Sequence, residues 1–65
     1  MPKYPDIIVK LVGKDGNAFN ILGICLQAMR RAGLSQDEQA TFENEALSGD
    51  YNNLLTTCMK WFNVK

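Results

Sequence analysis

The first apolar run and the turn after it have a clear pattern. Residues 7–12 are rich in β-branched side chains, which predicts a strand with Ile7, Val9 and Leu11 on one face. The glycine-rich and polar run at residues 13–17 predicts a turn. The opposite face of the strand is only partly polar, so we expect some cover on both of its faces.

The next segment predicts a broadly apolar helix. Its polar side chains fall within one arc when residues 18–32 are placed at helical spacing, and the rest of the circumference is apolar. Such a wide apolar arc indicates a helix covered on two sides. Asn17 is a suitable N-cap, and Gly33 is suited to the position after the last turn. A hairpin with a second strand at residues 18–22 is the alternative interpretation.

Two shorter helices follow. Ser35 and Glu38 have the spacing of a capping box before a helix at residues 35–47, and Asp50 is the expected N-cap of a helix at residues 51–61. The apolar stripe of the earlier of these helices is thin and consists of Ala40, Phe42, Ala46 and Leu47. The apolar side of the later one contains Tyr51, Leu54, Leu55, Cys58, Met59, Trp61 and Phe62. Its polar side consists of Asn52, Asn53, Thr56, Thr57 and Lys60.

Residues 62–65 are long enough to form a second, short strand. A single strand leaves its backbone groups without partners, so residues 7–12 must pair with this segment or with the same strand of a second copy. The predicted fold class is α+β and mostly α, in the order β-α-α-α-β. We expect one small domain over residues 1–65, with residues 1–5 flexible.

Composition narrows the chemistry. The formal net charge is zero, but residues 35–50 contain five acidic and no basic side chains, so the charge is segregated along the chain. Histidine is absent, which removes the commonest general base and a common zinc ligand. We expect neither an enzyme nor a cofactor or metal site.

Cys25 and Cys58 fall on apolar helical faces and are expected as buried free thiols. Free thiols and the lack of a membrane-length apolar run favour a cytoplasmic protein.

The turn offers one candidate for binding an anion. A loop that leads into a helix presents free N–H groups, to which Lys14, Gly16 and Asn17 would contribute, and Arg30 and Arg31 add positive charge. The Gly-x-x-Gly run also resembles the loop with which KH domains hold single-stranded nucleic acid, although a strand stands here where that family has a helix. Weak binding of nucleic acid or a phosphate ligand is the alternative function.

A protein partner is the preferred hypothesis. The exposed strand edge at Lys10 and Val12, or the acidic face formed by Asp37, Glu38 and Glu45, would supply the contact surface. We therefore expect a small intracellular interaction module that binds another protein or a second copy of itself.

The chain also resembles a group of small proteins. The resemblance lies in Gly-Lys-Asp-Gly-Asn-Ala-Phe at residues 13–19, Arg-Arg-Ala-Gly at 30–33 and Ser-Gly-Asp-Tyr at 48–51. These runs resemble small uncharacterised proteins of bacteria and their phages. The resemblance implies a compact intracellular accessory protein, and it supplies no activity and no functional residues.

Overall fold

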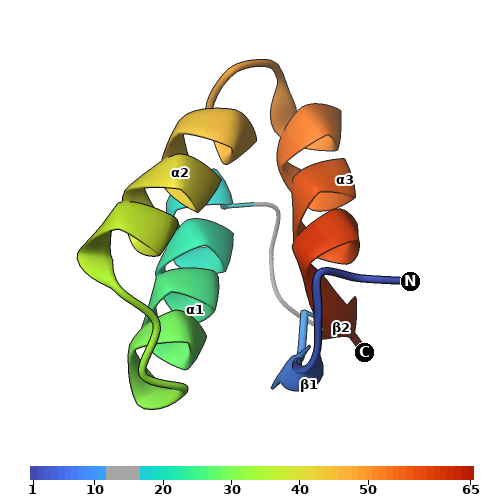
Figure 1. The fold of residues 1–65 in the computed structure, drawn as a ribbon. Helices are drawn as coiled ribbons and strands as arrows, with labels where there is room; N and C mark the ends of the chain where they lie inside the picture. The colour runs from blue at the N-terminus through green and yellow to red at the C-terminus, as the bar shows by residue number, and fades with distance from the viewer. Residues whose placement is uncertain (12–16) are drawn as a thin grey trace.

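In the part of the chain that the structure describes, three helices and two strands follow one another in the predicted order. A computed structural model describes residues 1–11 and 17–65. The elements are β1 (Tyr4–Val9), α1 (Ala18–Arg31), α2 (Gln36–Ala46), α3 (Tyr51–Trp61) and β2 (Phe62–Val64). Figure 1 shows the strands together at one end of the molecule, below α3 and beside α1. The β-α-α-α-β prediction is confirmed, and the hairpin alternative is wrong because residues 18–22 begin α1.

The two ends of the chain form a parallel ladder. β1 pairs with β2 in a register that joins Ile8 to Asn63 and Val9 to Val64, with an irregularity between Tyr4 and Ile8. Parallel neighbours require a long crossover between them, and here the three helices supply it. The strand begins and ends earlier than the predicted residues 7–12.

The first residues contact the C-terminal part of the chain. Tyr4 and Pro5 belong to β1, and the Lys3 N–H donates to the Lys60 carbonyl at 2.8 Å. The Tyr4 ring also packs against Trp61 and Phe62, with centroids 5.9 and 6.5 Å away. These long-range aromatic contacts hold a segment whose local sequence favours no regular structure.

The helix ends confirm the predicted caps. The side chains of Asn17, Ser35 and Asp50 each accept a hydrogen bond from a backbone N–H in the first turn of the helix that follows. Gly33 has a φ of +80°, which lets the chain turn after α1 without strain.

The core centres on a set of aromatic side chains. Phe42 is fully buried, and its ring lies 5.4 Å from the ring of Trp61 and 5.1 Å from that of Phe62. Phe42 and Ala46 are the buried residues of α2, so this helix is held largely by one ring. The buried apolar residues are Val9, Ile21, Leu22, Cys25, Met29, Phe42, Ala46, Leu54, Cys58, Trp61 and Phe62.

Several side chains differ from the predicted pattern. Phe19, on the wide apolar arc of α1, is 81% exposed, and Met59 of α3 is 57% exposed. The helical pattern places Thr57 on the polar side of α3, yet this residue is buried. Its hydroxyl donates to the Asn53 carbonyl at 2.8 Å and therefore needs no water.

Replacement of Phe42 by alanine tests the role of this ring. Phe42→Ala should lower the free energy of unfolding by about 3 to 5 kcal/mol, a large share of the stability of so small a domain. Phe19→Ala is the matched control and should change it by less than about 0.5 kcal/mol. Urea unfolding followed by circular dichroism measures both. Equal losses for the two variants would contradict the assigned core.

Candidate functional site

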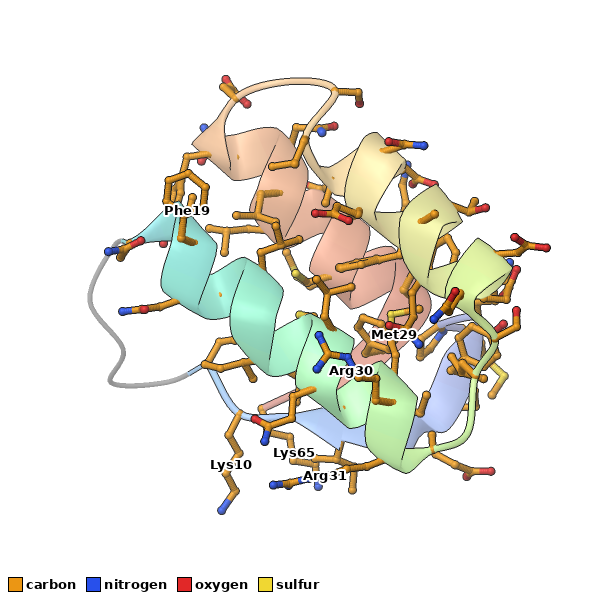
Figure 2. All side chains as sticks on the ribbon, turned by 90° about the vertical axis from the view of Figure 1, so that its left-hand side faces the viewer. Lys10, Phe19, Met29, Arg30, Arg31 and Lys65 are labelled. Carbon is orange, nitrogen blue, oxygen red and sulfur yellow. The ribbon has the colours of Figure 1, made fainter. Side chains whose placement is uncertain are left out.

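A groove runs between β1 and α1. Its walls are formed on the strand side by Ile8, Val9 and Lys10, and on the helix side by Ile24, Gln27, Ala28 and Arg31. The groove continues past Ile8 and Arg31 to Asp6, Ile7 and Ala32. We call this feature the β1–α1 groove. In Figure 2, β1 runs below and behind α1, and Lys10 and Arg31 are labelled at the lower side of the molecule.

The backbone of β1 is open along the groove. The Lys65 N–H donates to the Val9 carbonyl and the Leu11 N–H donates to the Lys65 carbonyl, each at 2.9 Å. Val9 and Leu11 therefore direct their backbone groups toward β2. Since successive residues of a strand alternate, Ile8 and Lys10 direct theirs to the opposite edge. In the described part of the chain the sheet has two strands, so nothing pairs with that edge.

The side chains along this edge also alternate. Ile7 is half-buried and Val9 is buried, whereas Asp6, Ile8 and Lys10 are exposed. Ile8 and Lys10 therefore share the outer face of the sheet. Asp6 is also exposed and lies two residues before Ile8, in the stretch of β1 where pairing with β2 is irregular. Ile8 is 53% exposed, which is unusual for a large aliphatic side chain in a strand. The groove thus combines unpaired backbone, an exposed apolar centre and opposite charges at its two ends.

Basic side chains gather around the groove. Lys10 and Arg31 line the groove, and Arg30 precedes Arg31 in the last turn of α1 (Figure 2). Lys65 lies at the other edge of β1, where its backbone pairs with Val9 and Leu11. In the described residues 1–11 and 17–65, the one ion pair joins Lys3 to Glu38. None of these four cations therefore lies within ion-pair distance of a carboxylate in the described chain.

The predicted anion site is not brought together. Lys14 and Gly16 lie outside the described residues. Asn17 caps the start of α1, while Arg30 and Arg31 occupy its last turn, a helix length of about 20 Å away. Arg31 lies instead beside Lys10, on the other side of the groove. Sequence spacing could not predict this neighbourhood, because it depends on how α1 crosses β1.

The predicted partner surface is also divided. Lys10 lies in the groove, Val12 falls outside the described residues, and Asp37 is exposed on α2. Glu38 and Glu45 are half-buried and already engaged within the fold. The Trp61 indole N–H donates to Glu45 Oε1 at 3.3 Å.

Glu38 joins α2 to the N-terminal residues. Its carboxylate accepts a hydrogen bond from the Tyr4 hydroxyl and forms an ion pair with Lys3 Nζ at 3.4 Å. Lys3 Nζ also lies 4.3 Å from the centroid of the Trp61 ring. The predicted capping box is half confirmed, because Ser35 accepts the Glu38 N–H as expected but the Glu38 side chain turns to Tyr4. Tyr4 was not predicted as a contact residue, because it lies in a segment that we expect to be flexible.

These contacts shift two pKa values in opposite directions. The Tyr4 hydroxyl, and secondarily Lys3, lower the pKa of Glu38 by stabilising its carboxylate, against a smaller opposing effect of burial. The same hydrogen bond raises the pKa of Tyr4, because the phenolate would face the carboxylate.

The two cysteines meet between α1 and α3. Cys25 and Cys58 are free and fully buried, and their sulfur atoms lie 3.4 Å apart. The hydrogen bond between them raises the pKa of Cys25 and lowers the pKa of Cys58. Both thiols are shielded from solvent, and the chain has no histidine to act as their base. Among the described residues, no group of three or more acidic or cysteine side chains is placed to hold a metal ion.

Comparisons with known proteins add no relative. No family model, curated protein or solved structure matches the chain. In the described ranges, none of the helices has the length and apolar character needed to cross a bilayer.

Replacement of Tyr4 by phenylalanine tests the Glu38 contact through pH. The lowered pKa of Glu38 contributes stability that is present above the ordinary glutamate pKa, about 4.3, and is lost as the pH falls through the lowered value. Tyr4→Phe should therefore be less stable than the wild type at neutral pH, and the difference should close in acid. Tyr51→Phe is the control, because Tyr51 is an exposed tyrosine on α3. Thermal unfolding across the acidic range measures both, and a gap that stays constant with pH would exclude this role for Tyr4.

Proposed function

We propose that this protein is a non-enzymatic interaction module that associates with a second copy of itself through the free edge of β1. The open backbone at Ile8 and Lys10 supports this function, because an unpaired strand edge is a template for another strand. This edge is the observation that carries the proposal.

A second copy suits the β1–α1 groove because of its charge. Lys10 lies at one end of the groove and Asp6 at the other. If a second copy of β1 runs antiparallel to the first, Asp6 of each copy faces Lys10 of the other. Association would also cover the exposed Ile8 side chain, a useful gain in a chain of 65 residues with a small core.

A charged residue at Ile8 tests the surface. Ile8→Lys places a cation at the centre of the contact and should weaken self-association by at least about tenfold, equivalent to ~1.4 kcal/mol. Met59→Lys is the matched control, because Met59 is similarly exposed and lies near the other edge of the sheet. Sedimentation equilibrium over a wide range of concentrations measures both variants and the wild type. A wild type that stays monomeric at high concentration, or an equal effect of Met59→Lys, would exclude this surface.

A second candidate function is weak binding of nucleic acid or a phosphate ligand. The observation that favours it is that Lys10 and Arg31 line the same groove, with Arg30 next to Arg31 in the last turn of α1. Few cations are involved, so binding would be weak and would fall steeply with salt.

Loss of two of these cations tests the second candidate. The double variant Arg30→Ala and Arg31→Ala should bind a fluorescent single-stranded oligonucleotide more weakly at low salt and show a shallower dependence on salt. Lys60→Ala, which removes an exposed cation from α3, should bind as the wild type does. Fluorescence anisotropy measures the binding. Absence of any binding by the wild type at low salt would end this candidate.

A further inference from the structure

The outer edge of β1 has a charge pattern that is symmetric about one residue. Asp6 and Lys10 are each two residues from Ile8, and all three side chains are exposed. Building on the proposed self-association, we propose that two copies pair antiparallel with Ile8 on the twofold axis. Lys10 of each copy then lies opposite Asp6 of the other, and the two sheets join into one sheet of four strands.

The backbone is compatible with this register. Directly opposed residues in an antiparallel pair either exchange both of their hydrogen bonds or none. Ile8 and Lys10 direct their N–H and carbonyl groups to the free edge, since Val9 and Leu11 use theirs on Lys65. With Ile8 on the axis, the two copies of Ile8 face each other through backbone groups that point to the free edge.

Other registers lose the charge pairing. An axis at Asp6 or at Lys10 places like charges directly opposite each other, which is destabilising. An axis one residue to either side of Ile8 places each charge opposite an uncharged residue. The Ile8 register is therefore the one in which both charges of each copy meet an opposite charge.

The ends of the edge restrict how far the ladder extends. Pro5 has no N–H to donate, and β1 departs from regular pairing between Tyr4 and Ile8. Proline, lysine and irregular pairing are features that protect edge strands from unspecific association. Here they keep the ladder between the two copies short, and its few backbone hydrogen bonds make the Asp6 and Lys10 side chains important for the choice of partner.

On the helix side of the groove, a residue that lines both parts alongside Ile8 is small. Ala28 lies beside Ile8 in both parts of the groove and has a small side chain. Arg31 also lines both parts, but it comes from α1 and is exposed, so solvent screens its effect on the ion pairs of the outer face.

A charge exchange tests the register. Asp6→Lys and Lys10→Asp should each weaken self-association at least about fivefold, because both symmetric pairs change from attraction to repulsion. The double variant that contains both substitutions should recover most of the affinity of the wild type. Asp37→Lys, an exposed change of the same charge on α2, should have little effect. Sedimentation equilibrium gives the dissociation constants, and circular dichroism confirms that each variant is folded.

Cross-linking gives a second measurement. In the variant Ile8→Cys, a short bismaleimide should join the introduced thiols of the two copies, because the side chains at this position meet at the axis and the native cysteines are buried. The variant Met59→Cys should not be joined in this way. If the wild type associates but the single charge variants behave like it, the register is wrong and the proposed function stands. If the wild type does not associate at all, both fail.

Discussion

The packing of Phe42 against Trp61 and Phe62 is the contact on which the fold depends. These three rings join α2, α3 and β2, and Tyr4 extends the cluster to β1. α2 buries little else, so its position relative to the sheet follows from where this ring fits. Its acidic side chains are then close enough to bind Tyr4 and Trp61. Some of the acidic side chains concentrated in residues 35–50 therefore form contacts within the molecule. Glu38 forms an ion pair with Lys3, and Glu45 accepts a hydrogen bond from the Trp61 indole.

Local signals predicted the elements well, and long-range contacts explain the differences. The caps at Asn17, Ser35 and Asp50 depend on residues a few positions away, which a sequence displays directly. Helical angle alone places Thr57 and Glu38 on polar, solvated faces. The hydroxyl of Thr57 instead finds a carbonyl within its own helix, and Glu38 finds a tyrosine 34 positions earlier. Such pairings become visible only when the elements are packed together.

The candidate site was less predictable than the fold. The sequence indicates Lys10 and Arg31 as candidate contact residues, and it does not single out Asp6. Lys10, Arg31 and Asp6 line one groove because α1 crosses β1 on the side that β2 leaves open. The predicted loop contribution of Lys14 and Gly16 falls outside the described residues. A groove between a strand edge and a helix has no short sequence motif, since its two walls come from separate segments of the chain.

The ladder between β1 and β2 also has a consequence for folding kinetics. It joins segments at the two ends of a 65-residue chain, so nearly the whole length must be ordered before its hydrogen bonds form. The helices have local contacts and local caps, and they can form and collapse earlier. Closure of the sheet then comes late, and during synthesis β1 remains without its partner until Phe62–Val64 has emerged. For that interval both edges of β1 are open, which makes this strand the segment most exposed to wrong pairing in the newly made chain.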